Sequence, residues 1–287
     1  MRYYDYNNLI TNSDVFLDKK VYNPTYSGDT VQLRVDLKRM MYWIGEENSR
    51  ELSGISVESY QHRINSGLGF SYNFENDFFK SHLFKIDYNY RFDVRKNFKI
   101  RLATSLGLNH YTLEYKIITL DTDLNISNNE DWSNHPILSF GALVNIKNHE
   151  IGLTIHDLLN KDINPADWSN PEMFKTFLVS NYNYGFRVSE TVELIPEIIL
   201  VWNPDVDFWI LNTTASFTNR FYGGISYRSN EDFSLMFAGR PWKKLKIGYT
   251  FTNEKFDASR ISHGMHAIHF SYIFFCIIYV KKIASLE

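Results

Sequence analysis

The chain has 287 residues, with 30 Lys and Arg against 33 Asp and Glu, so its formal net charge at pH 7 is −3. This balance gives no reason to expect a nucleic-acid partner, which usually selects a clustered excess of basic residues. The longest apolar run, Tyr272–Val280, is far shorter than the roughly 20 residues that a membrane-spanning helix needs. A single cysteine, Cys276, excludes a disulfide framework and a cysteine-based metal cluster.

Residues 1–30 are polar and aromatic, have no clear period and contain the turn-rich stretch Tyr22–Gly28. We expect them to form an N-terminal lead-in segment. Residues 1–6 lack the basic and then apolar pattern of an export signal. If the protein is exported, we therefore expect this numbering to begin in the mature chain.

Alternation of apolar and polar residues begins sharply at Val31 and recurs along the chain, for example in residues 84–92, 98–108 and 138–146. A period of two predicts β-strands with two unlike faces, and no helical period of similar strength competes with it. An apolar face towards lipid and a polar face towards a lumen are typical of an outer-membrane barrel. A soluble sandwich alternates in the same way, so the pattern alone leaves both folds open.

The clearest strand is the stretch 264–274, which we expect to close the barrel. Its two faces carry Ile268, Phe270, Tyr272 and Phe274 on one side and Ala267, His269 and Ser271 on the other. In total we predict an all-β, antiparallel barrel of about fourteen strands, an even number with the length that tilted membrane strands need. The strands are expected near residues 31–43, 51–62, 66–75, 82–92, 97–109, 136–146, 149–156, 175–187, 191–202, 208–218, 221–229, 232–239, 243–253 and 264–274.

The connections between these strands alternate in length. Short ones are expected at residues 63–65, 93–96, 147–148, 188–190, 219–220 and 240–242. The intervening ones are often longer, at residues 44–50, 110–135, 157–174 and 253–263. Short periplasmic turns and long extracellular loops are typical of outer-membrane barrels, whereas a sandwich does not sort its loops in this way. We therefore expect the short turns and both termini to face the periplasm.

Aromatic residues at strand ends suit the two membrane interfaces, where they would form girdles. The candidates are Trp43, Tyr90, Trp202, Trp209 and Trp242, and the alternative is that they are scattered core aromatics. The faces expected to point inward mix both charge signs. They carry Arg34, Asp36, Lys38, Lys85, Asp87, Arg91, Lys99, Arg101, Glu150, Glu193, Glu197, Lys244 and Lys246, together with Ile195, Ile199 and Val201. Inward aliphatic residues do not suit a wide aqueous pore, so we predict a packed or plugged lumen with charges paired across it.

No catalytic constellation is recognisable, so we expect neither an enzyme nor a cofactor. The chain has no Gly-x-Ser-x-Gly elbow, no phosphate loop and no His-Glu-x-x-His motif. His266 and His269 would point to opposite faces of a strand, so no histidine metal site is expected. The stretch Asp121–Asn125 begins like a calcium loop but lacks the later Gly and Glu ligand positions, so we interpret residues 120–132 as a solvated acidic loop.

The sequence Asp-Trp-Ser-Asn occurs twice, at residues 131–134 and 167–170, each near the end of a predicted long outer loop. A matched pair of aromatic residues at one barrel mouth could bind a partner, which makes Trp132, Trp168, Asp131 and Asp167 candidate partner-binding residues. The alternative is that the two copies are independent contacts of a loop with the barrel rim.

Several landmarks, taken in order, resemble the PorP/SprF family of outer-membrane proteins. The stretch Asn23–Gly28 is similar to the family's Asn-Pro-Ala-Tyr-Ala-Gly, with Asn23, Pro24, Tyr26 and Gly28 at the matching positions. The further landmarks are Gly67-Leu68-Gly69, Asp87–Tyr90, Gly152-Leu153 with Asp157–Asn160, Gly223–Ser229, Lys246–Tyr249 and His266–Phe274. The family's proline before the Asn-Leu-Leu-Asn element is missing, and residues 275–287 continue beyond the aromatic residue at which the family's chains normally end.

The resemblance implies a non-enzymatic outer-membrane barrel of the type IX secretion and gliding machinery of Bacteroidota. It implies a role in exporting or surface-anchoring a large adhesin-like protein, or a link to periplasmic secretion components. The expected partners are outer-membrane lipid, a secreted surface protein and other type IX components, with no nucleic acid. The expected division is a lead-in at 1–30, a barrel at 31–274 and a C-terminal extension at 275–287. The alternative function is an outer-membrane transporter or channel for a small or hydrophobic solute; an outer-membrane hydrolase is disfavoured, because no strand offers a Ser–His pair on the lipid face.

Overall fold

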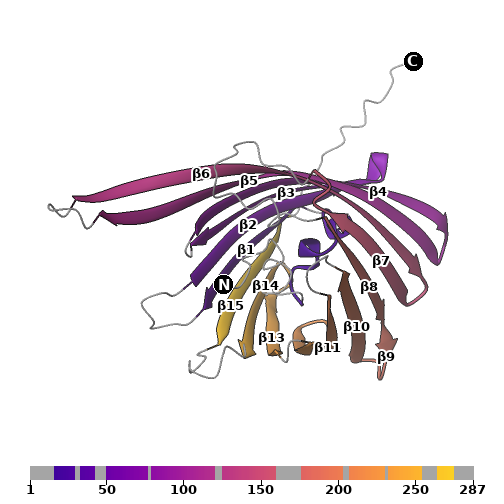
Figure 1. Cartoon of the computed structure of the whole chain (residues 1–287). Helices are drawn as coiled ribbons and strands as arrows, with labels where there is room; N and C mark the ends of the chain where they lie inside the picture. Colours follow the sequence, from indigo (N-terminus) through magenta and orange to yellow (C-terminus); the bar gives the residue numbers. More distant parts are fainter. Residues whose placement is uncertain are drawn as a thin grey trace, which may run out of the picture.

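The computed structural model describes residues 16–29, 33–42, 50–76, 79–119, 125–159, 176–202, 207–229, 232–253 and 264–274. Within these ranges the chain is almost entirely β-structure (Figure 1). The strands of the first half are β1 (Leu33–Tyr42), β2 (Arg50–Gln61), β3 (Ser66–Asn76), β4 (Phe79–Arg95), β5 (Phe98–Thr119), β6 (Asn125–Ile146) and β7 (His149–His156). Those of the second half are β8 (Phe177–Tyr184), β9 (Phe186–Arg187), β10 (Val192–Trp202), β11 (Phe208–Phe217), β12 (Phe221–Arg228), β13 (Phe233–Trp242), β14 (Leu245–Asn253) and β15 (Met265–Phe274).

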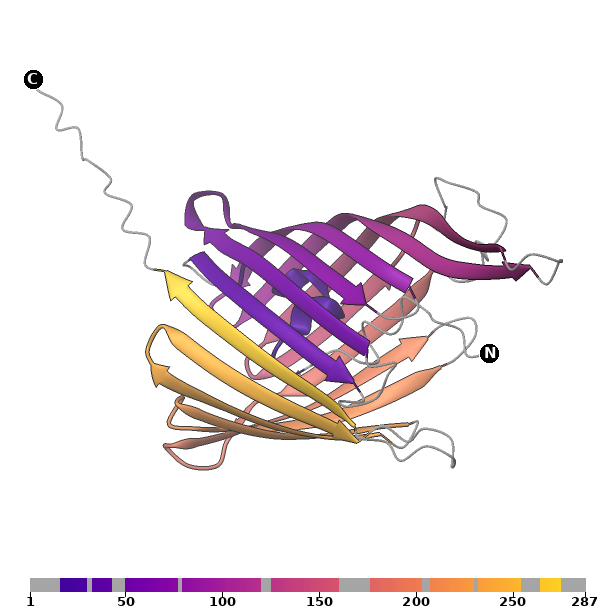
Figure 2. The ribbon, with the colours of Figure 1, turned by 90° about the vertical axis from the view of Figure 1, so that its left-hand side faces the viewer.

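Consecutive strands pair antiparallel, and the sheet closes on itself because β15 pairs with β1, with Leu33 opposite Phe274. β8 and β9 both pair with β10 and are separated by Gly185, so they form one interrupted strand. The fifteen strand segments therefore make a closed antiparallel barrel of fourteen strands, which confirms the predicted fold class. Figure 2 shows the strong tilt of the strands, with β1 and β15 side by side at the closure.

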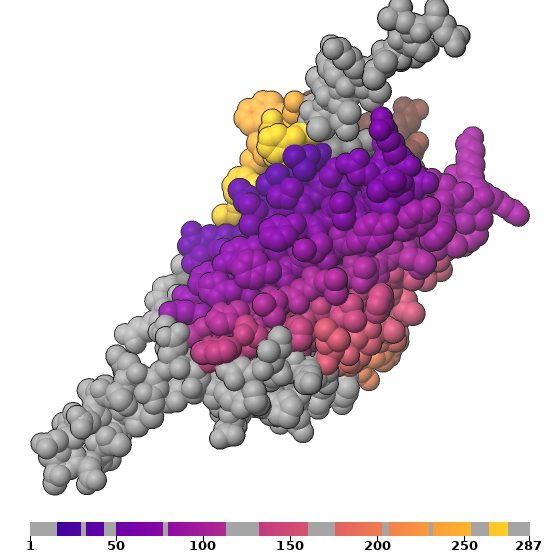
Figure 3. Space-filling model, turned by 90° about the horizontal axis from the view of Figure 1, so that it is seen from above, coloured from indigo at the N-terminus to yellow at the C-terminus, as the bar shows by residue number. Residues whose placement is uncertain are grey.

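The alternation seen in the sequence sorts the side chains between the two faces of the wall. On β5, Leu102 is 49% exposed on the outer face, whereas Ala103 and Ser105 are buried on the inner face. The closing strand β15 follows the same rule, because Phe270, Tyr272 and Phe274 are exposed while Ala267, His269 and Ser271 are buried. Figure 3 shows the indigo to magenta strands side by side in one unbroken outer wall, and the outward apolar side chains of these strands are exposed on it. A contiguous apolar belt around a closed barrel is the surface that a bilayer requires.

The two ends of the barrel differ. At the end where β1 begins and β15 ends, the strands are joined by short connections, which we call the short-turn end. Asn65, Lys147, Thr218 and Asn219 adopt positive φ in these turns. The connections at the opposite end, the long-loop end, include residues 43–49, 157–176 and 254–264.

The aromatic girdles are also present in the described residues. Tyr90 and Trp242 are exposed at the short-turn end, and Trp202 and Trp209 at the long-loop end. Trp43 lies outside the described residues.

One long connection was predicted wrongly. Residues 110–135 were expected to form a loop, but β5 continues to Thr119 and β6 begins at Asn125, with these two residues paired. The resulting hairpin projects beyond the neighbouring strands (Figure 1). Residues 110–119 are rich in aromatic and β-branched residues that favour strands, and the register set inside the barrel holds their Asn-rich partner stretch in the extended form.

Among the described residues, no helix is long and apolar enough to cross a bilayer. Within the described ranges the helical structure consists of three single 3₁₀ turns: η1 (Lys19–Val21), η2 (Pro24–Tyr26) and η3 (His62–Ile64). The first two belong to the lead-in, which enters the barrel.

Candidate functional site

Residues 16–29 lie inside the barrel, and we call them the lumenal plug. Figure 2 shows its two short indigo turns, η1 and η2, enclosed by strands from both sides of the wall. Every residue from Tyr22 to Gly28 is buried. The stretch that carries the family resemblance, Asn23–Gly28, is therefore the centre of the filled lumen. The prediction of a plugged lumen is confirmed, although the sequence did not show that the lead-in itself is the plug.

The compact shape of the plug follows from its own residues. The Asn23 side chain accepts hydrogen bonds from the Thr25 backbone N–H, at 3.0 Å, and from the Thr25 hydroxyl, at 2.8 Å. This caps η2, and Pro24 at its first position supplies a backbone that is already set for a turn. Gly28 then leaves the turn with φ +65°, a conformation that costs little only for glycine.

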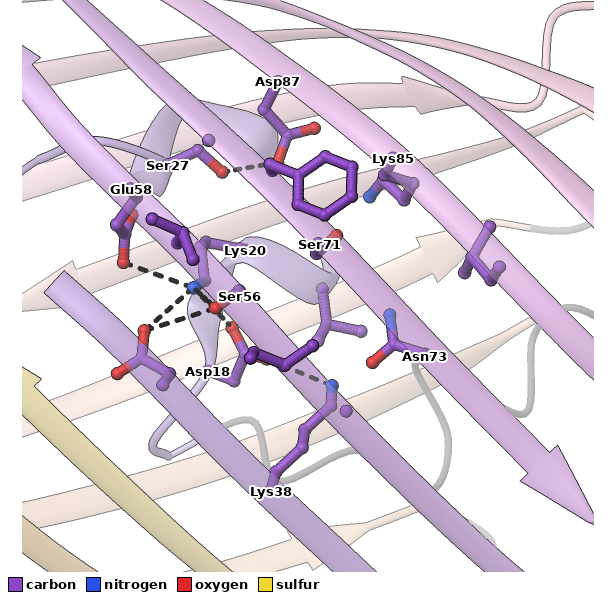
Figure 4. A pocket seen from close by; sticks show the side chains of 18 of the residues that line it. Asp18, Lys20, Ser27, Lys38, Ser56, Glu58, Ser71, Asn73, Lys85 and Asp87 are labelled. Atoms are coloured by element: carbon purple, nitrogen blue, oxygen red, sulfur yellow. Dashed lines mark hydrogen bonds and ion pairs between the residues drawn. The ribbon is translucent and has the colours of Figure 1, made fainter.

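One wall of the lumen binds the plug through charges. The Lys20 ammonium lies 3.1 Å from a carboxylate oxygen of Asp36 and 3.2 Å from one of Glu58. It also donates to the Ser56 hydroxyl at 2.8 Å. Asp18 of the plug is in turn 3.1 Å from the Lys38 ammonium of β1. Figure 4 shows Lys20 at the centre of this network, between the plug and β1 and β2.

These pairings shift the ionisation of the two plug residues. Burial alone would raise the pKa of the Asp18 carboxyl, but the charges of Lys38 and Lys20 outweigh it and hold that pKa below its ordinary 3.8. Burial alone would lower the pKa of Lys20, yet Asp18, Glu58 and Asp36 raise it above its ordinary 10.5. Both side chains therefore stay charged in the lumen at neutral pH.

The opposite wall binds the plug as well. The Lys19 ammonium and the Tyr22 hydroxyl each lie 2.9 Å from the same carboxylate oxygen of Glu197 on β10. The Tyr26 hydroxyl donates to Glu150 on β7. The Nε2 atom of His156 is 2.9 Å from the Tyr22 carbonyl oxygen. Because the contacts reach β1, β2, β7 and β10, the plug links opposite sides of the barrel.

Apolar packing accompanies these polar contacts. The rings of Tyr22 and Tyr26 meet edge to face, with centroids 5.7 Å apart. They form one buried cluster with wall side chains, namely Leu143, Phe177, Val179, Ile199, Val201 and Ile210. Two of the three inward aliphatic residues that argued against an open pore, Ile199 and Val201, therefore belong to the surface on which the plug packs. Such a core is stabilised by removing apolar area from water.

Glycines on the inner wall make room for the plug. A Cβ atom built on Gly141 would lie 2.7 Å from the Asn23 side-chain oxygen. One on Gly152 would lie closest to the Asn181 side-chain oxygen of β8 and 2.8 Å from the Asn23 side-chain nitrogen. A Cβ on Gly224 would be 2.9 Å from the Phe16 ring. Glycine in a strand often marks the close approach of another backbone. These inward glycines were the signal in the sequence that could have located the plug.

One of the spaces beside the plug is small. A cavity of about 50 Å³ lies beside Lys20, between the plug and strands β1 to β4 (Figure 4). Ser27 donates to Asp87 at its edge, and the Gly28 N–H donates to Glu58 at 2.6 Å. A cavity of this size holds a few water molecules at most and provides no passage for a solute.

The candidate partner-binding residues lie elsewhere. Trp132 is a residue of β6, paired with Thr112, and its indole is 47% exposed on the outward face. Its ring centroid is 6.2 Å from that of His110. Asp131 is also in β6. The prediction that the first Asp-Trp-Ser-Asn copy lies near the end of a loop is therefore wrong, because this copy is part of a strand. Asp167 and Trp168 lie outside the described residues, so the pairing of the two copies remains a prediction.

Among the described residues, no group of three or more His, Cys, Asp or Glu side chains could hold a metal ion. The stretch 121–124 of the imperfect calcium motif lies outside the described residues. At the long-loop end, His135 and Asp157 are both fully buried, with Nε2 2.8 Å from a carboxylate oxygen. This pair ties β6 to the chain that leaves β7.

Solved outer-membrane proteins share this architecture at low sequence identity. Omp33 of Acinetobacter baumannii matches with a TM-score of 0.55 and 7% identity, over 85% of this chain and 99% of that chain. The Pseudomonas putida toluene transporter TodX matches with a TM-score of 0.56 and 10% identity, over 93% of each chain. The CymD monoaromatic hydrocarbon channel has a TM-score of 0.50 and 10% identity, over 95% and 94%. At such identities the likeness establishes the fold alone.

Comparison with curated proteins gives no match. One family model, described as type IX secretion system membrane protein PorP/SprF, matches residues 11–272. The matched range contains both the whole lumenal plug and nearly all of the barrel that encloses it. The chain therefore belongs to the PorP/SprF family of type IX secretion system membrane proteins, a non-enzymatic family of the bacterial outer membrane.

Proposed function

We propose that this barrel serves type IX secretion as a closed binding platform. It helps to export or to surface-anchor a large adhesin-like protein, or it links to periplasmic secretion components. The observation that supports this is the plug, which is held by ion pairs and hydrogen bonds on opposite walls of the lumen. A barrel with a filled lumen is not built to pass a solute, so its two ends are the surfaces at which we expect binding. Membership of a secretion family supports a partner among secreted proteins or machinery components.

The long-loop end offers the surface for a secreted partner. The β5–β6 hairpin extends past the end of β4, which pairs with β5 only up to Leu113. Trp132 lies near this level with its indole exposed on the outward face. An indole presents a large contact area and loses little conformational freedom on binding. Trp132 and Trp168, with Asp131 and Asp167, are therefore the residues that we propose to contact the partner.

The experiment is recovery of the surface partner from intact cells with tagged barrel variants. Trp132→Ala and Trp168→Ala, alone and together, are expected to fold and insert normally but to recover less partner; Trp132 lies on the outward face, away from the lumen. Trp202→Ala, another exposed tryptophan at the same end, is the matched control and should recover partner normally. Normal recovery by the double variant, together with loss of recovery when residues 1–15 are removed, would contradict the role of these tryptophans and assign the contact to the N-terminal residues.

The rival function, a transporter or channel for a small or hydrophobic solute, predicts stable conductance when the full chain is inserted in a planar bilayer. The binding-platform function predicts no stable open channel, because the plug contacts both walls. A variant that lacks residues 16–29 should conduct, and its migration on gels without heating reports whether the barrel has folded. Stable conductance of the full chain would favour the transporter.

A further inference from the structure

A groove of about 480 Å³ lies on the outer face of the wall, over strands β11 to β14 near the short-turn end. We call it the lipid-face groove. Its floor lies at Gly223 of β12 and Gly239 of β13, where an added Cβ atom would meet nothing within 4 Å. Its sides are outward apolar side chains, namely Phe217, Phe221, Phe237, Ile247 and Tyr249. The volume lies within the range of about 300–1,000 Å³ that is usual for small-molecule sites.

The strand register explains why a groove forms at this place. Phe221 lies opposite Gly239, and Phe237 lies opposite Gly223, so each glycine has a large ring beside it on the neighbouring strand. The two glycines are diagonal neighbours on adjacent strands, so the gaps that they leave join between the two rings. Further from the short-turn end the wall is filled again, because Ile225 and Leu235 lie opposite each other. The groove is therefore bounded along the strands.

The position of the groove decides what can reach it. Ile247 and Tyr249 are exposed on the outer face, whereas Gly248 between them is buried on the lumenal face. The groove therefore opens towards the bilayer and not into the lumen. Trp242 follows Gly239 by three residues and belongs to the aromatic girdle at the short-turn end, so the groove lies just inside the hydrocarbon region.

The surface offered to an occupant is apolar. The two tyrosines of the lining already use their hydroxyls: Tyr249 lies 2.7 Å from the Nδ1 atom of His266, and Tyr222 donates to the Asn219 carbonyl oxygen at 2.9 Å. Apolar cavities do not hold water and take apolar ligands instead. At this depth in a bilayer the apolar ligand present in excess is an acyl chain.

Basic side chains lie at the end of the groove that is nearest to water. Arg220 directly precedes Phe221, and Lys243 lies in the β13–β14 turn; both are exposed. The two turns are adjacent, because the Arg240 N–H donates to the Arg220 carbonyl oxygen at 2.7 Å. Arginine and lysine donate charge-assisted hydrogen bonds to phosphate groups. This arrangement matches a molecule with an apolar chain and a phosphate at its polar end.

We propose that the lipid-face groove binds one phospholipid of the leaflet at the short-turn end. Its acyl chain lies over Gly223 and Gly239, between the rings of Phe221 and Phe237, and its phosphate lies beside Arg220 and Lys243. Such a lipid differs from those around the rest of the belt, because its chain contacts protein below and on both sides. The proposal goes beyond the binding platform and does not depend on the surface partner.

The test measures phospholipid binding to the full chain in detergent by native mass spectrometry, with phosphatidylglycerol and phosphatidylethanolamine titrated separately. The wild type should bind the first lipid of either kind more tightly than any further one. Gly223→Leu with Gly239→Leu fills the groove and should weaken this first binding about tenfold or more, because the chain loses apolar burial. Ser59→Leu is the matched control: it adds the same side chain to the lipid face of β2, since its neighbours Glu58 and Tyr60 are buried in the wall's inner face.

Two further variants probe the side and the polar end of the groove. Phe237→Ala should weaken the first binding, and the barrel should still fold because this ring is 63% exposed. Phe140→Ala, at an exposed phenylalanine of β6, is its control. Arg220→Gln with Lys243→Gln should weaken the binding of both lipids, whereas Lys96→Gln in the exposed β4–β5 turn at the same end should not.

Unheated gel migration verifies that each variant has folded, and a phospholipid with a photoreactive acyl chain should crosslink mainly to β12, β13 and β14. The proposal is overturned if the folded wild type binds all lipids with equal affinity, if the controls lose as much affinity as the groove variants, or if the crosslinks spread evenly around the belt. Unchanged lipid binding by the groove variants, together with loss of a copurifying protein, would assign the groove to a protein and would also overturn it. Failure of the pull-down with the tryptophan variants leaves these results unaffected, so the two proposals fail separately.

Discussion

Gly141 and Gly152 have no Cβ atom, and this absence leaves room for the plug beside the wall. Both lie on the inner face of neighbouring strands, where Asn23 of the plug approaches the wall more closely than a Cβ atom would allow. In a water-filled barrel such positions could hold polar side chains, as other lumen-facing positions do. At the scale of single residues, the wall is therefore shaped to fit one particular segment of its own chain.

The residue-scale prediction compares an inward with an outward glycine. Gly141→Val should push against Asn23 and Pro24 and cost about 1–3 kcal/mol, because overpacking a filled interior forces side chains and backbone to shift. Gly239→Val is the control, since an added Cβ there meets nothing within 4 Å. The measurement is the free energy of unfolding in lipid vesicles. Equal costs for the two variants would contradict the assignment of Gly141 to the plug contact.

The strands are the elements that the sequence predicted best. Period-two alternation located all fourteen strands, because one face of each strand contacts lipid and the other faces the lumen. Residues on the lipid face are apolar and most residues on the lumenal face are polar, so the alternation can be recognised in the sequence. The extension of β5 and β6 was missed because residues 125–134 are rich in Asn, Ser and acidic residues, which read as a loop when taken alone. Their strand form depends on pairing with residues 110–119, a long-range effect that local preference does not contain.

The plug could be predicted only in part. The mixed charges and aliphatic residues on inward faces predicted a filled lumen, but residues 16–29 have no period that would assign them to it. Lys19 and Lys20, which bind opposite walls, look like an ordinary solvated pair in the sequence. Glu197, the partner of Lys19, lies far along the chain, and Asp36, a partner of Lys20, lies on the following strand. Neither ion pair can therefore be recognised from local sequence.

At this scale the prediction concerns pH. Asp18 has a lowered pKa in the folded protein, so its contribution to the free energy of unfolding is complete above its ordinary pKa of 3.8 and is lost as the pH falls below it. Lys20 has a raised pKa, so its contribution is complete below its ordinary pKa of 10.5 and is lost only as the pH rises through its higher folded value. The seated plug should therefore be most stable between these two pH values.

Urea unfolding midpoints in vesicles, compared at about pH 7 and about pH 3, test the acid limb of this profile. The Asp18→Asn variant is the control, because it cannot ionise at this position. It should be less stable than the wild type at neutral pH and should lose less on acidification. An identical pH dependence for the two proteins would mean that Asp18 does not link the plug to Lys38.

For the whole molecule, the sorting of connections gives an orientation. Short turns at one end and connections of variable, often greater length at the other correspond to the periplasmic and outer sides of known barrels. A protease site inserted between Lys147 and Asn148 should therefore be protected in intact cells. A site inserted at residues 120–124, between β5 and β6, should be cut from outside. The reverse pattern of cleavage would overturn the orientation.

The pairing of β1 with β15 has a consequence for the order of assembly. Closure joins the first and last strands of the barrel, the contact of greatest sequence separation and therefore of high entropic cost. The plug directly precedes β1, so it is synthesised before any wall strand and is available to be enclosed when the seam between β1 and β15 forms. Its contacts with β1 and β2 and with β7 and β10 are of a kind that would hold the sheet curved while that seam forms. We therefore expect the plug to be enclosed as the barrel closes, so that filling the lumen and forming the β1–β15 seam occur together.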